Sequence, residues 1–153
     1  SQFSCGSERL DQYLRAQAGQ DARKHVAAPF VLCEGESNTV LGYYTLSGIS
    51  VDIGAWPENV VKKLPRYPLL PATLLGRLAI DRQLQGKGAG EYLLMDALHR
   101  SLQAAHQVAA LAVIVDAKDA RAVAFYRHYE FTPFADQPAR LFLPMGVIEK
   151  LFP

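Results

Sequence analysis

The sequence contains very little cysteine. Cys5 and Cys33 are its only two, and they form neither a CxxC pair nor a disulfide framework. This excludes a disulfide-stabilised secreted scaffold and favours a reducing compartment, so we expect a cytoplasmic protein. The four histidines also lack HxxxH spacing and any His/Cys spacing typical of metal ligands. We therefore expect no metal site.

Long apolar runs are missing as well. No stretch approaches the roughly 20 residues that cross a bilayer, so we expect no membrane-spanning helix. The first residues show no secretory signal, and because the chain begins at Ser1, we expect a native methionine and a few further residues to precede it.

Neither sign of charge is in excess. The 16 Lys and Arg residues against 15 Asp and Glu residues give a net charge of +1. This balance argues against a nucleic-acid module that works by bulk charge, and it leaves room for a local basic patch.

The length of 153 residues is that of one domain, residues 1–153, with a sizeable core. Alternating and helical apolar patterns predict the order α-β-β-loop-β-α-β-α-β-β, which indicates an α/β domain with a mixed central sheet flanked by helices. A right-handed β-α-β unit is expected at its centre.

The expected elements follow from this patterning. A first helix, with Ser7 as its N-cap, is followed by two strands that form a hairpin turning at residues 36–38. The expected ranges are helix 7–18, strands 28–35 and 39–51, strand 73–81, helix 89–105, strand 108–117 buried on both faces, helix 118–129, and closing strands 131–135 and 140–145.

Residues 52–73 contain four prolines. This density argues against a long helix or a central strand, so we expect an irregular surface excursion with a short helix near residues 58–63. Loops of such length inside a compact domain are usually functional. Three cations lie here, Lys62, Lys63 and Arg66.

Three glycines, Gly86, Gly88 and Gly90, lie between a predicted strand and a predicted helix. Glycine tolerates positive φ, and amides at a helix start have no intrahelical acceptor, so this junction suits a phosphate or pyrophosphate. Lys87 adds a positive charge. The alternative is a tight turn whose glycines serve packing only. The spacing matches neither the Rossmann fingerprint nor a Walker loop.

The segment QGKGAG, residues 85–90, matches the Q/R-x-x-G-x-G/A pattern of the GNAT acetyltransferases, which the chain resembles over its whole length. Phe125-Tyr126 resembles the second family signature, FYxxxGF, although Glu130 stands where glycine is common. The resemblance implies the GNAT fold and acetyl-CoA as co-substrate. It assigns the pantetheine arm to the backbone of Leu78, Ala79 and Ile80, and Phe125 to the cofactor site as well. The pyrophosphate is assigned to Gln85, Gly86, Lys87, Gly88, Ala89 and Gly90.

A closer resemblance is to the GNAT toxins of bacterial toxin–antitoxin pairs, carried by FSCGSERLDQYLRAQA, GYYTLSGISV, YPLLPATLLGRLAID and VDAKD. It implies acetylation of the α-amino group of aminoacyl-tRNA, which blocks translation, a ribbon-helix-helix antitoxin as partner, and a homodimer. Two alternatives stay open. One is a GNAT enzyme for a small amine or a protein N-terminus, and the other is a non-catalytic module that binds CoA or tRNA.

Tyr126 is the catalytic candidate. Adjacent helical residues point about 100° apart, so with Phe125 facing the core Tyr126 can reach the thioester sulfur and act as general acid. The alternative is a buried tyrosine bonded to a carbonyl. Either Asp116, at the end of a predicted strand, or Asp119 is expected to cap the following helix. The alternative role for Asp116 is a contact near CoA.

Arg77 lies within a predicted strand and requires a partner. Either a carboxylate or an RNA phosphate meets this need. Together with Lys62, Lys63 and Arg66 it forms the set of residues expected to contact tRNA. The alternative is that these basic residues lie on a solvated surface and form a few salt bridges.

Overall fold

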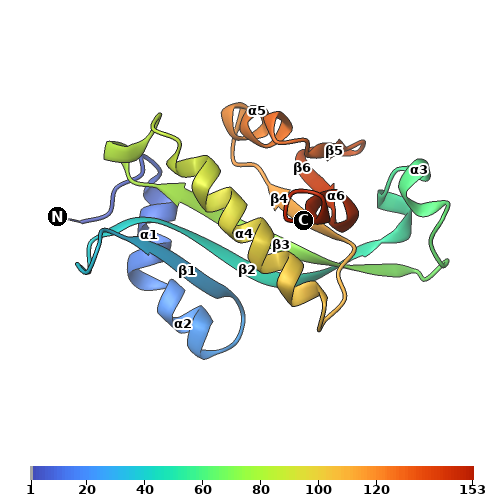
Figure 1. The fold of residues 1–153 in the computed structure, drawn as a ribbon, viewed down its shortest axis with the longest axis horizontal. Helices are drawn as coiled ribbons and strands as arrows, with labels where there is room; N and C mark the ends of the chain where they lie inside the picture. Colours follow the sequence, from blue (N-terminus) through green and yellow to red (C-terminus); the bar gives the residue numbers. More distant parts are fainter. Residues whose placement is uncertain (1) are drawn as a thin grey trace. The chain divides into compact units, whose positions relative to one another are not determined.

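The computed structural model describes residues 2–153, which form two compact units (Figure 1). Within the described residues, the first unit joins residues 2–47 to Leu75–Leu98, and the second joins Gly48–Leu74 to His99–Pro153. No helix within the described residues is long and apolar enough to cross a membrane.

Helices and strands alternate in the order expected of an α/β protein. The helices are α1 (Glu8–Ala16), α2 (Ala18–Arg23), α3 (Glu58–Val61), α4 (Ala89–Ala105), α5 (Ala120–His128) and α6 (Met145–Glu149). The strands are β1 (Ala28–Cys33), β2 (Val40–Asp52), β3 (Leu69–Ile80), β4 (Ala112–Asp116), β5 (Thr132–Phe134) and β6 (Gln137–Pro144), with 3-10 turns at Ile53–Ala55 and Arg82–Leu84. The sheet order is β1-β2-β3-β4-β6-β5, which confirms the mixed sheet flanked by helices.

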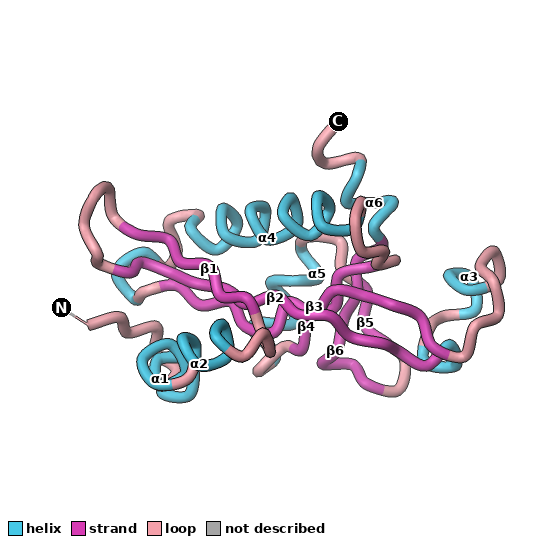
Figure 2. The backbone as a smooth tube through the Cα atoms, turned by 90° about the horizontal axis from the view of Figure 1, so that it is seen from below, coloured by secondary structure: helices cyan, strands magenta, loops and turns pink. Residues whose placement is uncertain are grey.

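In the first unit, β1 and β2 form the predicted antiparallel hairpin, with Ala28 opposite Leu46 and Cys33 opposite Val40. Figure 2 shows α4 along one face of strands β1 to β3 and α1 with α2 on the opposite face. The hydroxyl of Ser7 accepts a hydrogen bond from the amide of Leu10, which confirms the predicted N-cap of α1.

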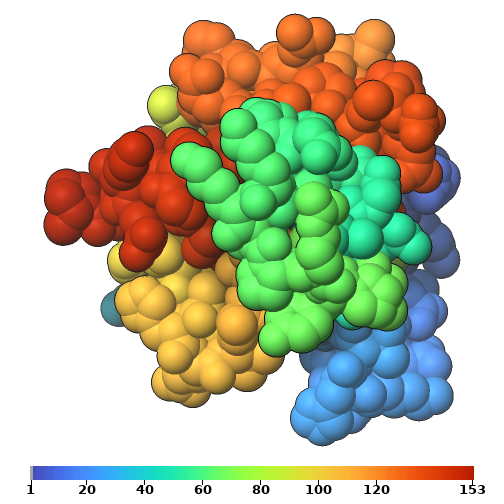
Figure 3. Space-filling view, turned by 90° about the vertical axis from the view of Figure 1, so that its right-hand side faces the viewer, coloured from blue at the N-terminus to red at the C-terminus, as the bar shows by residue number. Residues whose placement is uncertain are grey.

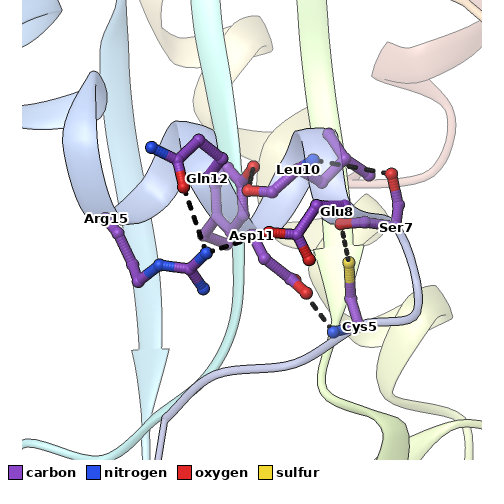
Figure 4. Close-up of polar contacts among 8 residues, drawn as sticks. Cys5, Ser7, Glu8, Leu10, Asp11, Gln12 and Arg15 are labelled. Atoms are coloured by element: carbon purple, nitrogen blue, oxygen red, sulfur yellow. Dashed lines mark hydrogen bonds and ion pairs between the residues drawn. The ribbon is translucent and has the colours of Figure 1, made fainter.

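Polar contacts fix the start of α1 (Figure 4). The buried carboxylate of Asp11 accepts a 2.9 Å hydrogen bond from the amide of Cys5. The guanidinium of Arg15 donates to Glu8 and Gln12 on the exposed side of the same helix. The segment before α1 is therefore tied to the helix by its first turn.

The core of the first unit is built from aromatic and small apolar side chains. The ring of Tyr43, which is fully buried, stacks on Tyr13 and meets Phe3 edge-on. Its hydroxyl donates a 2.7 Å hydrogen bond to the carbonyl of Leu10. A buried tyrosine requires a partner for its hydroxyl, and this one finds it on α1.

The second unit is built around Trp56. Its indole lies edge-on to Phe134 at 5.2 Å and to Phe142 at 5.4 Å, measured between ring centroids. Strands β4, β6 and β5 pair antiparallel beneath this cluster. In Figure 3 the green segment with α3 and the loop after it faces the viewer, beside the orange and red segments of the same unit.

The proline-rich segment departs from the prediction. Its short helix is confirmed as α3, but β3 begins at Leu69 and includes Pro71. Burial alternates there, with Leu70 and Ala72 buried and Pro71 exposed. Proline lacks only the donor, and the carbonyl of Pro71 accepts a 3.0 Å hydrogen bond from the amide of Leu111. Proline density was therefore the wrong reason to exclude a strand.

Other boundaries also differ. The first helix ends at Ala16, because Gln17 leaves helical geometry and its side chain donates to Asp21 in the separate helix α2. Strand β4 begins at Ala112 instead of residue 108. The amide of Val108 still donates a helical hydrogen bond to the carbonyl of Ala104, so the chain cannot be extended there. Helix α6 was not predicted.

Candidate functional site

The glycine turn connects β3 to α4 in the first unit. Strand β3 ends at Ile80, and the Asp81 side chain accepts from the amide of Gln83 to cap the 3-10 turn that follows. Gly86 and Gly88 then adopt φ of +79° and +83°, values that L side chains rarely take. A Cβ on either glycine meets no atom within 4 Å, so both face open space. Gly90 differs, because it lies inside α4.

The turn leaves backbone amides free to bind a ligand. The amides of Gln85 and Lys87 donate to the carbonyls of Arg82 and Leu84, which closes the turn. The amides of Gly88, Ala89 and Gly90 lie at the helix start, where no preceding helical turn supplies an acceptor. With the positive end of the α4 dipole and the exposed Lys87, these amides fit a pyrophosphate.

The side chain of Gln85 has a role that the sequence did not predict. Its amide nitrogen donates to the carbonyl of Cys5 at 2.7 Å and to that of Ile80 at 3.0 Å. The amide of Ser4 donates to Asp81, and the amide of Arg82 donates to the carbonyl of Ser4. The N-terminal segment is thereby strapped to the turn. A contact across 80 residues has no signal in one sequence.

The expected pantetheine strand, Leu78 to Ile80, lies at the end of β3, with Ala79 and Ile80 buried. A glycine that sequence reasoning missed supports it. A Cβ on Gly42 of β2 meets Leu93 of α4 at 2.8 Å and the carbonyl oxygen of Ala79 at 3.0 Å. Only glycine lets α4 and β3 approach β2 this closely, which positions the start of α4 over the strand.

Tyr126 lies on α5 in the second unit. Asp119 caps this helix by accepting from the amide of Ala122. The ring of Tyr126 packs against Phe131 at 5.3 Å and Phe125 at 5.2 Å. Burial raises the pKa of the Tyr126 phenol well above its ordinary value, so the group is protonated at cellular pH and is a weaker acid than an exposed tyrosine.

The orientation of the two aromatic residues was predicted wrongly. Tyr126 is buried with 7% of its surface exposed, whereas Phe125 is half-buried. The reason lies after the helix, where the chain reverses sharply. The amide of Phe131 donates to the carbonyl of Tyr126, which draws the ring of Phe131 onto that of Tyr126.

Glu130 stands at the position where the FYxxxGF pattern has glycine. It has φ of +74°, the left-handed conformation that glycine adopts without cost. The turn after α5 therefore keeps the geometry for which the family uses glycine, with a glutamate held in it. The glutamate therefore carries backbone strain that a glycine would avoid.

Arg77 has a partner that neither sequence reading named. Its guanidinium carbon lies 3.6 Å from the centroid of the Tyr13 ring, a cation–π contact. The Tyr13 hydroxyl donates to Asp21 at 2.7 Å. Burial and this bond raise the pKa of Tyr13 to about 12. Hydrogen bonds from Gln17 and Tyr13, and the charge of Arg77, lower the pKa of Asp21.

Asp116 does not cap α5, which corrects the first prediction for it. Its two oxygens accept from the Arg140 guanidinium at 2.8 and 2.9 Å, across paired positions of β4 and β6. The hydrogen bond to Asp116 raises the pKa of Arg140. The predicted role of Asp116 near CoA stays a prediction.

The residues expected to bind the acceptor lie in the second unit. Lys62, Lys63 and Arg66 are all exposed in the loop between α3 and β3. Tyr126, Phe125 and Asp116 belong to the same unit, whereas the glycine turn and Arg77 belong to the first. Across residues 2–153, no group of three His, Cys, Asp or Glu side chains is placed to hold a metal.

Comparison with known proteins shows which family this chain is similar to. The model of an acetyltransferase (GNAT) domain matches residues 71–143. The chain is 38% identical over 143 residues to the tRNA-acetylating toxin of Mycobacterium tuberculosis (strain ATCC 25618 / H37Rv), covering 94% of this chain and 84% of the relative.

Solved structures of related toxins have the same fold as this chain. AtaT complexed with acetyl-methionyl-tRNAfMet matches with a TM-score of 0.91 and 35% identity, over 99% of this chain and 90% of that one. A tyrosine-to-phenylalanine mutant of AtaT, bound to the C-terminus of the antitoxin AtaR and acetyl-CoA, matches with a TM-score of 0.84 and 32% identity, over 98% and 88%. The chain belongs to the GNAT acetyltransferase family, in which its relatives include the tRNA-acetylating toxins.

Proposed function

We propose that this chain moves the acetyl group of acetyl-CoA to the α-amino group of aminoacyl-tRNA and so acts as a toxin that blocks translation. In this proposal residues 1–153 act as one GNAT domain. The observation that carries it is the glycine turn at the start of α4, whose free amides and open space suit a pyrophosphate, in a chain similar to tRNA-acetylating toxins over 94% of its length.

Bound acetyl-CoA supplies an activated thioester. The turn from Gln85 to Gly90 holds its pyrophosphate, and the backbone of Leu78, Ala79 and Ile80 holds the pantetheine arm. Exposed Lys87 adds a charge-assisted contact to the phosphates. Gln85 acts through its side chain, since its bonds to Cys5 and Ile80 fix the turn in the binding conformation.

The acceptor needs little activation. The α-amine of an aminoacyl ester has a pKa near or below that of a chain terminus, ~7.7–8, so much of it is already neutral at cellular pH. Its nitrogen attacks the thioester carbon, and a backbone N–H stabilises the developing oxyanion. The C–S bond then breaks, the hydroxyl of Tyr126 protonates the departing sulfur, and the nitrogen releases its extra proton to solvent, from which Tyr126 regains one. The phenol of Tyr126 carries its proton at cellular pH, because the ordinary pKa of tyrosine is about 10 and burial raises it.

The acceptor's RNA is proposed to lie on Lys62, Lys63 and Arg66, with Arg77 as a further contact. Residues 52–66 contain these three cations and two acidic residues, Asp52 and Glu58, which gives this segment a net charge of +1. This sign favours a phosphate-bearing acceptor over a small amine, for which a narrower and more acidic pocket is expected. A lysine acceptor has a pKa of ~10.4 and requires a base to deprotonate it.

The partners follow from the same proposal. The relative AtaT has been solved with the C-terminus of its antitoxin AtaR. We infer a cognate antitoxin for this chain, of the ribbon-helix-helix type, together with a homodimeric state and a cytoplasmic location, where its substrate is found.

The experiment compares acetylation of aminoacyl-tRNA with that of the free amino acid at several salt concentrations. We expect turnover only of the charged tRNA. Its kcat/KM should fall steeply with salt, because each neutralised phosphate adds about −0.7 to −0.9 to the log–log slope. Equal rates on the two acceptors would remove the proposal and favour an enzyme for small amines.

A further inference from the structure

The loop before β3 exposes a large aromatic side chain. Residues 65–69, Pro-Arg-Tyr-Pro-Leu, form a proline arch between two anchored residues. Leu64 and Leu70 pack into the Trp56 cluster on either side of it. Tyr67, at the centre of the arch, keeps 64% of its surface exposed. Its ring therefore contributes little to folding of the second unit.

The arch is held in place. Pro65 and Pro68 each restrict φ to about −65°. The carbonyl of Pro68 accepts a 2.9 Å hydrogen bond from the amide of Ile53, and the amide of Leu64 donates to the carbonyl of Val61. A ring on a fixed loop loses little conformational freedom when a ligand covers it, so the exposed face is prepared for contact.

Cations surround this ring along the chain. Arg66 is its neighbour, and Lys62 and Lys63 precede the arch, all three exposed. Basic side chains that attract the backbone, combined with an open aromatic face, are the features by which proteins hold unpaired nucleotides. Paired bases are already stacked within a duplex and cannot lie on a ring, whereas the unpaired 3′ end of a tRNA offers free base faces.

We propose that Tyr67 is a stacking platform for an unpaired base at the 3′ end of the acceptor tRNA. This inference rests on the proposed function and adds a residue to it. Stacking tolerates any base, so Tyr67 positions the aminoacylated end and does not select the tRNA. The cations around it supply the salt-dependent attraction, and the ring supplies a contact that salt affects little.

The test uses a short single-stranded RNA ending in ACCA, with 2-aminopurine in place of the terminal adenine. Its fluorescence is quenched when the base stacks. We expect Tyr67→Ala to weaken binding about 5- to 150-fold and to abolish the quenching. Tyr67→Phe keeps the ring and should bind like the wild type. Leu69→Ala removes another exposed apolar side chain, 55% exposed, from the same arch and should also leave binding unchanged.

Salt separates the ring from the charges. Arg66→Ala should lower the dependence of log Kd on log salt by about one, whereas Tyr67→Ala should leave that slope unchanged. With aminoacyl-tRNA, Tyr67→Ala should raise KM and leave kcat at saturation unchanged. The melting temperature of each variant shows that the fold is intact.

Two failures have different signatures. If Tyr67→Ala binds the probe with wild-type affinity and quenching, the stacking role is wrong, and this holds even when the variant loses affinity for a protein partner. If the wild-type enzyme does not acetylate aminoacyl-tRNA, the proposed function fails. The probe measurement still reports on the arch in that case, because it requires no turnover.

Discussion

The two units of this protein hold their candidate functional residues in different ways. In the first unit, polar contacts fix the functional turn: Gln85, Asp81 and Arg82 bind the backbone of Ser4 and Cys5. In the second, apolar rings fix Tyr126, and the Trp56 cluster anchors the loop with the basic residues. Among the described residues, the Trp56 indole nitrogen is the one buried side-chain nitrogen or oxygen without a hydrogen-bond partner.

This difference matches the two reactants of the proposed reaction. A pyrophosphate requires fixed amides, which hydrogen bonds position, and the first unit provides them. The proposed proton donor, Tyr126, lies instead in an apolar environment in the second unit, which raises its pKa. Perturbing the first unit should therefore change acetyl-CoA binding, and perturbing the second should change turnover and acceptor affinity.

The largest expected effect is on Tyr126 in the second unit. Tyr126→Phe removes one oxygen and retains the ring contacts with Phe125 and Phe131. General acid catalysis contributes ~10²–10⁴-fold, so we expect kcat to fall by a comparable factor. Acetyl-CoA affinity, measured by calorimetry, should barely change. A stable variant that acetylates at the wild-type rate would show that Tyr126 is a core residue only.

The pH profile of the same pair of proteins sharpens this. The wild-type kcat/KM should rise with pH as the acceptor amine loses its proton near ~7.7–8 and then level off. Because burial raises the pKa of Tyr126 above its ordinary value, no descending limb from this group is expected below about pH 10. A limb that descends near pH 8–9 in the wild type and vanishes in Tyr126→Phe would contradict the raised pKa.

The next effect is on the glycine turn of the first unit. Gly88→Ala places a methyl group in the open space before α4 and strains a residue at φ +83°. Losing one amide contact to a charged ligand costs about 1.5–3 kcal/mol, so we expect acetyl-CoA affinity to fall about 10- to 150-fold by calorimetry.

A matched control separates strain from binding. Gly35, in the β1–β2 turn, also has positive φ, +51°, and open space around it. Gly35→Ala should lower stability and leave the affinity for acetyl-CoA unchanged. If both variants lose affinity equally, Gly88 has only a structural role.

Local patterns allowed much of this structure to be predicted. Helix periodicity identified α4 and α5, alternation identified the β1–β2 hairpin, and glycine spacing identified the turn at Gly86 and Gly88. Proline gave the wrong boundary at Pro71, because what matters is whether the neighbouring strand needs its missing N–H.

Contacts distant in sequence were not predictable. Nothing in the residues around Gln85 indicates that it binds Cys5, and an arginine in a strand gives no sign of whether its partner is a carboxylate, a phosphate or the ring of Tyr13. Such partners depend on which elements become neighbours in the fold. Local motifs thus allowed the residues of the candidate site to be proposed, whereas the contacts that hold these residues in place could not be predicted.

A smaller effect distinguishes the two roles of Arg77. Arg77→Met keeps most of the apolar stem and removes the charge over Tyr13, so we expect a loss of about 0.5–2 kcal/mol in the free energy of unfolding. Denaturant titration measures this. If Arg77 also binds RNA, the salt slope of aminoacyl-tRNA turnover decreases as well. An unchanged slope with lowered stability assigns Arg77 to the first unit's scaffold alone.

The smallest effect lies in the turn after α5 and tests how the second unit holds Tyr126. Glu130 adopts φ of +74°, which costs an L residue about 1–2 kcal/mol. Glycine removes this strain, but it also lowers the free energy of unfolding by about 0.5–1 kcal/mol, because an unfolded chain with glycine at this position is more flexible. Glu130→Gly should therefore stabilise the protein by up to about 1.5 kcal/mol, seen as a higher denaturant midpoint at unchanged slope. Since the amide of Phe131 donates to the carbonyl of Tyr126 whichever residue precedes it, kcat should stay at the wild-type value. Glu130→Ala keeps the strain and serves as the control, because it removes the carboxylate without freeing the backbone. If the alanine variant gains as much stability as the glycine variant, the carboxylate is the source of the cost and the backbone conformation is not.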